Sequence, residues 1–208
     1  MANRLIITLA LGLLAAAGCG SSSASRSTTT AASSNAPTAS TSSSVGALSG
    51  EAASAATGDI PDNQVFLTFH DRGAGYSISY PEGWARKGTS ADTTFADKNN
   101  VVHIVIAKAA PATTSSVAAE LTRLKQSNPS LTSTRPAIAH LKSGIPAIKS
   151  TYTTRSAPDP VTGKTVVLVV DRYELSGAGK RATVDLGTPK GVDNVDAYRM
   201  MINSFRWQ

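Results

Sequence analysis

Cysteine is nearly absent from this chain. The 208 residues contain one Cys, at position 19, and none in the later part of the sequence that is expected to fold. A domain of about 150 residues buries about 70% of its unfolded surface and folds without disulfides. The composition therefore excludes a disulfide framework and a thiolate metal centre in that domain. It also leaves Cys19 without a structural role, because a lone Cys at the end of a leader has no partner.

The sequence also lacks the patterns that carry catalysis or bind a cofactor. It contains no Gly-x-Ser-x-Gly elbow, and His70, His103 and His140 do not have metal-ligand spacing. The segment 177–180 resembles part of a phosphate loop, but Arg181 stands where Ser or Thr is required, so a hairpin turn is favoured. We therefore expect no catalytic residue, no metal and no cofactor, with an envelope hydrolase or transferase of unrecognised site as the alternative.

The positive charge is spread along the chain. Lys and Arg number 20 against 14 Asp and Glu, a net charge of +6, but no basic run stands beside aromatic residues. This distribution favours general attraction to anionic surfaces, and we expect no nucleic-acid partner. Four acidic residues could converge as paired carboxylates, although those in the last two strands are expected to face solvent: Asp159, Asp171, Glu174 and Asp185.

Residues 1–18 have the three parts of a secretory signal. Arg4 provides the positive start, residues 5–14 form a short apolar stretch, and residues 15–18 are small. The Ala-Ala-Gly-Cys tetrad at 16–19 resembles the lipobox of bacterial lipoproteins, with Ala16 in place of the usual Leu. The resemblance implies a diacylglyceryl group on Cys19 and a location at the outer face of the bacterial cell membrane. The lipid anchor then makes the membrane a partner of the chain.

Residues 19–61 follow as the lipidated Cys and a tether. From Gly20 to Gly58 the chain consists mainly of Ser, Thr, Ala and Gly, and it has no aromatic residue. Such a segment cannot bury enough apolar surface to offset its chain entropy, which predicts a disordered linker. Its Ser and Thr clusters could accept O-linked sugars or could form a plain spacer, and both alternatives remain open.

Residues 62–208 have the pattern of one α+β domain. Alternating or continuous apolar runs predict strands at 65–69, 76–80, 101–106, 147–154, 165–175 and 180–186. One helix is expected from a Ser115 or Ser116 cap to Asn128-Pro129, and a second from near Asp193 with a Val195, Tyr198, Ile202, Phe205 stripe. Hairpin-length connections favour a largely antiparallel sheet packed with helices.

Three segments of this domain carry a resemblance to a known fold. Residues 76–84, Tyr-Ser-Ile-Ser-Tyr-Pro-Glu-Gly-Trp, resemble the opening of the PsbP-like fold. Residues 144–147 are similar to its mid-domain turn, and Ser204-Phe205-Arg206-Trp207 to its ending. With the leader and tether, the chain also resembles LpqN-type actinobacterial envelope lipoproteins. The resemblance implies an α/β/α sandwich with an accessory, non-enzymatic role.

We therefore expect a binding module for an envelope protein, a lipid or a small apolar ligand. The predicted contact surface is locally basic and consists of Arg155, Lys164, Lys180 and Arg181 around the 155–164 hairpin and the 176–180 turn. The alternative is that these charges only keep the hairpins soluble. Trp84, Tyr76, Tyr80 and Trp207 could line a ligand pocket, but a place in the core is favoured.

Overall fold

The computed structural model describes residues 58–159 and 161–208, so the leader, Cys19 and most of the predicted tether lie outside the described residues. The strands before the first described helix are β1 (Phe66–Asp71), β2 (Tyr76–Pro81), β3 (Ala85–Thr89), β4 (Asp92–Asp97) and β5 (Asn100–Lys108). The elements after them are α2 (Thr114–Ser127), β6 (Ala137–His140), β7 (Pro146–Arg155), β8 (Val167–Gly177), β9 (Lys180–Pro189), α3 (Val195–Ser204) and β10 (Arg206–Trp207).

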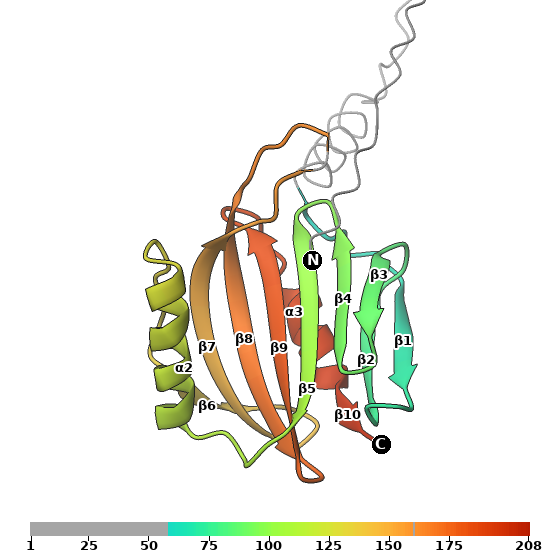
Figure 1. Cartoon of the computed structure of the whole chain (residues 1–208). Helices are drawn as coiled ribbons and strands as arrows, with labels where there is room; N and C mark the ends of the chain where they lie inside the picture. Colours follow the sequence, from blue (N-terminus) through green and yellow to red (C-terminus); the bar gives the residue numbers. More distant parts are fainter. Residues whose placement is uncertain (1–57, 160) are drawn as a thin grey trace, which may run out of the picture. The chain divides into compact units, whose positions relative to one another are not determined.

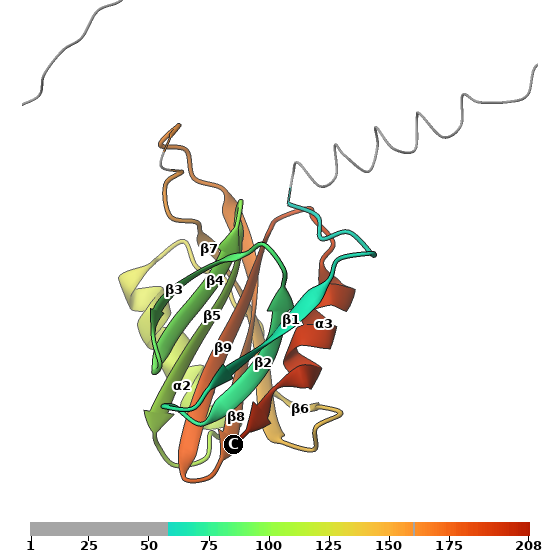
Figure 2. The same ribbon diagram turned by 90° about the vertical axis from the view of Figure 1, so that its right-hand side faces the viewer.

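Two antiparallel sheets organise the domain. The larger has seven strands in the order β3-β4-β5-β9-β8-β7-β6, and the smaller has three in the order β1-β2-β10. Helix α2 lies on one face of the large sheet, whereas α3 and the small sheet lie on the other (Figure 1, Figure 2). The architecture is the predicted α+β sandwich. Strand β5 lies between β4 and β9, and this interior position agrees with a sequence that is largely apolar on both faces of the strand.

The main core lies between the large sheet, the small sheet and α3. Tyr76 and Phe205 are fully buried there and stack with ring centroids 5.6 Å apart. Tyr80 stacks on Phe95 at 4.3 Å, and Trp84 is also buried in the same cluster. The core interpretation of Tyr76 and Trp84 is therefore confirmed, and truncating a buried aromatic of this kind costs about 3–5 kcal/mol.

A smaller apolar cluster joins α2 to β7. Val117 and Leu121 of the helix pack against Ile148, as their spacing predicts. Thr113 caps the helix, since its side chain accepts from the Ser116 amide while the Ser116 hydroxyl accepts from the Thr113 amide. The predicted cap at Ser115 or Ser116 is therefore wrong by two or three residues, because Ser116 is the second member of a reciprocal capping pair.

Helix α3 buries a different stripe from the predicted one. Tyr198 and Ile202 are buried as expected, and Met201 joins them. Val195 is the first residue of the helix and is 57% exposed. Phe205 is buried but follows the helix as its C-terminal cap, so its position depends on the chain turning into β10.

Packing of the domain begins earlier than residue 62. The Gly58 carbonyl accepts hydrogen bonds from the side-chain amides of Asn100 and Asn194. The Ile60 amide donates to Asn194 Oδ1 at 2.8 Å, and the Ile60 side chain is buried in the main core. The last residues assigned to the tether are therefore part of the folded domain. None of the described helices is both long and apolar enough to cross a membrane.

Candidate ligand pocket and the polar network beneath helix α2

A pocket opens where the start of α2 faces the β6–β7 hairpin. Its volume is about 570 Å³, within the size range of small-molecule sites. Most of its walls are aliphatic, and the apolar lining residues are Pro111, Ala112, Ile138, Ala139, Leu141, Ile145, Pro146, Ala147 and Ile148. The polar lining residues are Thr113, Thr114, His140, Glu174 and Ser176.

Local hydrogen bonds hold the helix wall of this pocket in place. The Ala112 amide donates to Ser176 Oγ at 3.1 Å, which ties the chain before α2 to β8. On the opposite wall, β6 pairs with β7 so that Ile138 lies beside Ile148. Ile138 is 70% exposed and therefore forms part of the mouth of the pocket rather than of the core.

Glu174 of β8 borders the pocket from below. Its side chain has no exposed surface, and the Thr183 hydroxyl lies 3.0 and 2.9 Å from its two carboxylate oxygens. Burial raises the pKa of Glu174 to about 7, although the Thr183 hydrogen bond and the Arg181 charge act in the opposite direction. Among the acidic residues that the structure describes, Glu174 is therefore the one whose ionisation state changes near neutral pH.

Arg181 connects Glu174 to the helix above it. Its Nε lies 3.3 Å from Glu174 Oε2, and its Nη2 donates to Glu120 Oε1 of α2 at 2.9 Å. Glu120 and Arg181 are each about one quarter exposed or less. The position of α2 and the charge beside the pocket are consequently linked through one guanidinium group.

A second buried ion pair lies further along the same sheet face. Arg172 donates from Nε and Nη2 to both oxygens of Asp185, at 2.7 and 2.6 Å. The Tyr152 hydroxyl donates to Asp185 Oδ2, and the Arg172 guanidinium lies 5.2 Å from the Tyr152 ring centre. Burial raises the pKa of Tyr152, and the negative charge of Asp185 raises it further. Burial by itself lowers the pKa of Arg172, but the Asp185 contacts outweigh it and raise that pKa.

The predicted solvent exposure is therefore wrong for Glu174 and Asp185, whereas 29% of the Asp171 side chain is exposed. Glu174 has no exposed surface and Asp185 is 6% exposed. The physical reason is that β8 and β9 lie in the middle of a seven-stranded sheet whose α2 side is partly covered. Charges on such strands are retained because each one meets an opposite charge across the strand pair.

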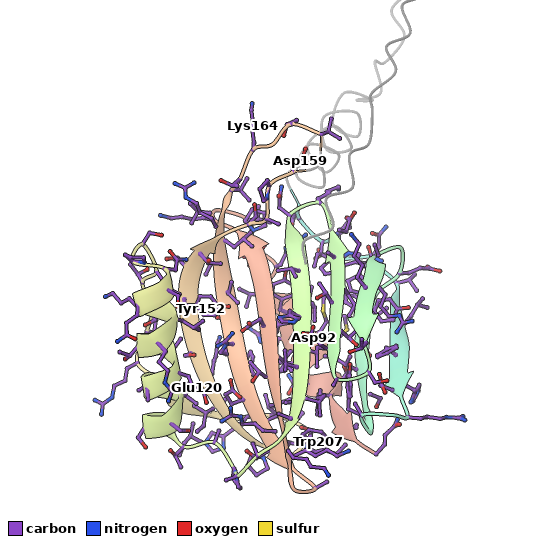
Figure 3. All side chains as sticks on the ribbon, viewed as in Figure 1. Asp92, Glu120, Tyr152, Asp159, Lys164 and Trp207 are labelled. Carbon is purple, nitrogen blue, oxygen red and sulfur yellow. The ribbon has the colours of Figure 1, made fainter. Side chains whose placement is uncertain are left out.

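The four basic residues predicted to form one contact surface do not meet. Arg155 ends β7 and Lys164 lies in the β7–β8 connection, whereas Lys180 and Arg181 begin β9 at the other end of β8. The length of β8 separates the two pairs by about 30 Å. Figure 3 shows Lys164 far from Trp207, whose indole ring lies against Gly177 beside the β8–β9 turn. Lys180 donates to the Ala74 carbonyl, and Arg181 belongs to the network beneath α2.

The three histidines lie apart from one another, on different strands. His103 Nε2 is 2.8 Å from Asp92 Oδ1, and His70 Nδ1 is 2.7 Å from the Gln208 amide. His140 lines the pocket mouth. Within the described ranges, no three His, Cys, Asp or Glu side chains are placed to hold a metal ion.

Two other hollows differ in chemistry from the pocket beside α2. The larger, about 720 Å³, lies where Ile60 meets the start of α3 and has four aspartates on its rim: Asp59, Asp62, Asp193 and Asp196. The smaller, about 290 Å³, is an open groove beside Tyr152 and Asp185, whose polar atoms are already paired. Apolar walls with a few convergent polar groups favour the pocket beside α2 as the ligand site.

No protein-family model matches the chain, and no curated protein matches it in sequence. Among solved structures, the chain is similar to cyanobacterial PsbP (CyanoP) from Synechocystis, with a TM-score of 0.53 and 14% identity over 73% of this chain and 98% of that one. A Bacteroides thetaiotaomicron protein (TM-score 0.45, 14% identity) is matched over 68% of this chain and 48% of its own length. The Saccharomyces cerevisiae Ran-binding protein Mog1p (TM-score 0.47, 9% identity) is matched over 70% and 96%. The likeness to CyanoP shows the PsbP-like fold that residues 76–84 indicated.

Proposed function

We propose that this chain is an LpqN-type envelope lipoprotein, held by lipid on Cys19 at the outer face of the cell membrane, and that its domain is a non-enzymatic binding module. The leader, the unique Cys and the Ser- and Thr-rich segment support the anchor. Two or more acyl chains hold a protein stably on a bilayer, whereas a single chain does so only marginally.

The observation that carries the binding role is the aliphatic pocket of about 570 Å³ beside α2. A hollow of this size with few polar groups suits a small apolar ligand, or the apolar part of a lipid. An apolar hollow with defined walls favours these ligands over a protein partner, which needs a broad exposed patch. The anchored domain would then bind its ligand close to the membrane.

The arrangement around Glu174 favours binding over turnover. Its raised pKa would suit a general acid, but its carboxylate is fully buried and already bonded to Thr183 and paired with Arg181. A general acid needs hydrogen-bond reach to the reacting atom. Turnover of envelope esters or glycans by the purified chain would overturn the non-enzymatic proposal.

The pocket can be tested with octan-1-ol as an uncharged aliphatic probe, titrated by NMR into the chain carrying Cys19→Ala, so that no attached acyl chain competes. Ile138→Asp places a carboxylate in the apolar mouth, and ligand entry would remove water from that carboxylate. We expect this desolvation to cost more than 1.4 kcal/mol, the free energy that corresponds to about tenfold weaker binding. Ile138 is 70% exposed, so the fold should tolerate the change. We expect binding to the parent chain and at least ~10-fold weaker binding to the variant.

A matched control is Val161→Asp, which makes the same kind of change at a residue that is 90% exposed and does not line the pocket. This variant should bind octanol as the parent does. Equal octanol binding by the Ile138→Asp and Val161→Asp variants, or no binding by the parent, would remove the pocket as the ligand site.

A further inference from the structure

The lining of the pocket narrows the chemistry of its ligand. Among the described residues that line it, none is Phe, Tyr, Trp, Lys or Arg, and the one imidazole, that of the exposed His140, lies at the mouth. Planar rings and sugars are held by stacking on aromatic side chains, and anionic groups by Arg or Lys. The aliphatic walls therefore suit a flexible aliphatic group without a negative charge.

Glu174 is the ionisable group that lies beneath the pocket, inside the sheet. It has no exposed surface, and its negative charge is opposed by few hydrogen-bond donors, namely Thr183 and Arg181 of β9. An apolar ligand that fills the pocket replaces the water of the pocket with a less polar medium, close to a carboxyl group that itself has no exposed surface. Loss of nearby water disfavours the charged form of a carboxyl group and raises its pKa further.

The charged groups that act on Glu174 come from three elements, β9, β8 and α2. Arg181 of β9 and Arg172 of β8 favour its ionised form, whereas Glu120 of α2 disfavours it. Arg181 is shared with Glu120, so its charge is not free to neutralise Glu174 alone. His140 of β6 is the other ionisable residue of the pocket lining and lies at its mouth.

We propose that the pocket takes an uncharged aliphatic ligand and that Glu174 takes up a proton when this ligand enters. The inference rests on the proposed binding function and adds the ligand class and its regulation. Because binding and protonation are linked, the ligand binds more tightly at low pH and is released as Glu174 ionises. Conversely, the ligand raises the pH at which Glu174 loses its proton.

Octan-1-ol tests this coupling because the probe has no group that titrates in the range used. The dissociation constant of octanol is measured at about pH 5.5 and at about pH 8.5 on the chain carrying Cys19→Ala. At the higher pH it should be about tenfold higher for each unit by which octanol raises the pKa of Glu174. Calorimetry near neutral pH, in two buffers of different ionisation enthalpy, should show proton uptake on binding.

Two variants assign the proton. Glu174→Gln keeps the shape of the side chain without its charge, and should bind octanol at both pH values as tightly as the parent does at low pH. His140→Gln removes the other ionisable lining residue and should keep the parent's pH dependence. Pocket binding that is independent of pH and takes up no proton overturns the inference and leaves the proposed function standing. Loss of the pH dependence in His140→Gln but not in Glu174→Gln also overturns it.

The remaining outcomes are equally decisive. Absence of octanol binding at every pH overturns the proposed function and this inference together. If Glu174→Gln does not fold, the parent chain still decides the question, because the carbon-13 shift of the Glu174 carboxyl group reports its pKa with and without octanol. An unchanged pKa in the presence of bound octanol overturns the inference.

Discussion

The Nε of Arg181 lies 3.3 Å from Oε2 of Glu174, and the Glu174 side chain has no exposed surface. Taking a carboxylate out of water costs several kcal/mol, and a nearby cation offsets that cost only in part. The same guanidinium also binds Glu120 on α2. The ion pair therefore links the stability of the domain, the position of the helix and the charge beside the pocket.

The first prediction concerns pH and stability. The pKa of Glu174 rises from an ordinary 4.5 to about 7, so the unfolded chain loses this proton at lower pH than the folded chain. The free energy of unfolding should therefore fall as pH rises from about 4.5 to about 7, by about 3 kcal/mol from this group. Urea unfolding at a series of pH values measures it. In Glu174→Gln this part of the pH dependence should disappear, and parallel pH profiles for the two proteins would contradict the assignment.

The second prediction compares a buried ion pair with an exposed one. Asp185→Ala leaves the Arg172 guanidinium without its bidentate partner in a mostly buried position, which should cost about 3–5 kcal/mol. Asp196→Ala removes an equally short contact to Arg199, but both side chains are exposed, and the cost should stay below about 1 kcal/mol. Denaturant unfolding of both variants is the measurement. Similar losses of stability in the two variants would show that the Asp185–Arg172 ion pair contributes less to stability than its geometry indicates.

The main strands were predictable because their apolar residues are large and regularly placed. Strands β2, β5, β7, β8 and β9 each contain such a run, and the Gly-Ala-Gly segment at 177–179 forms the expected tight β8–β9 turn. Strand β4 was missed because its buried residues are Thr93 and Phe95, so it offers only one large apolar side chain. Strand β6 is four residues long and mostly exposed, and its place in the sheet depends on pairing with β7.

The candidate site was less predictable than the fold. The sequence shows Glu174 in a strand with polar neighbours, which favours a solvated face, and nothing local shows that α2 covers it. Arg172 and Glu174 alternate on one strand, and Asp185 and Thr183 lie opposite them on the next. This pattern of cross-strand pairs is the sequence signal from which the buried ion pairs could have been predicted. The predicted basic surface failed for a different reason, because one strand joins the two hairpin connections and places them at opposite ends of the sheet, as the predicted span of residues 165–175 already implies.

The third prediction concerns the close approach of Trp207 to Gly177. A Cβ added at Gly177 would overlap the indole ring of Trp207, and the Gly177 backbone is not in the left-handed region, so contact alone opposes a side chain there. Gly177→Ala should therefore destabilise the domain by about 1–3 kcal/mol. Thermal unfolding measures the loss. In a chain carrying Trp207→Ala the same substitution should cost much less, and an equal cost in both backgrounds would show that the two residues are not coupled.

The fourth prediction concerns the residues that lead into the first strand. Ile60 is 9% exposed and belongs to the main core, although the sequence assigns it to the tether. Ile60→Ala should cost about 2–5 kcal/mol, as for other buried aliphatic residues. Val65→Ala is the matched control, since Val65 is 55% exposed and should lose less than about 1 kcal/mol. Equal stability of the two variants would mean that the domain begins at residue 62 after all.

The last prediction concerns the proposed anchor. Cys19 is the only Cys of the chain and follows a short apolar stretch and four small residues. If its thiol carries diacylglycerol, the buried acyl chains contribute about 0.8 kcal/mol per methylene, enough for stable membrane attachment by two or more chains. Cys19→Ala should therefore move the protein from the membrane pellet to the soluble exported fraction, as judged by fractionation of intact cells.

Ser22→Ala, three residues further along, should leave the protein in the pellet and controls for disturbance of the leader. Extraction of the parent protein into detergent, together with a mass increase at the N-terminal peptide, would identify the lipid directly. Persistence of the Cys19→Ala protein in the pellet, with no lipid mass on the parent peptide, would contradict the anchor. That outcome would also separate the binding function of the domain from any place at the membrane, because the pocket beside α2 does not depend on residue 19.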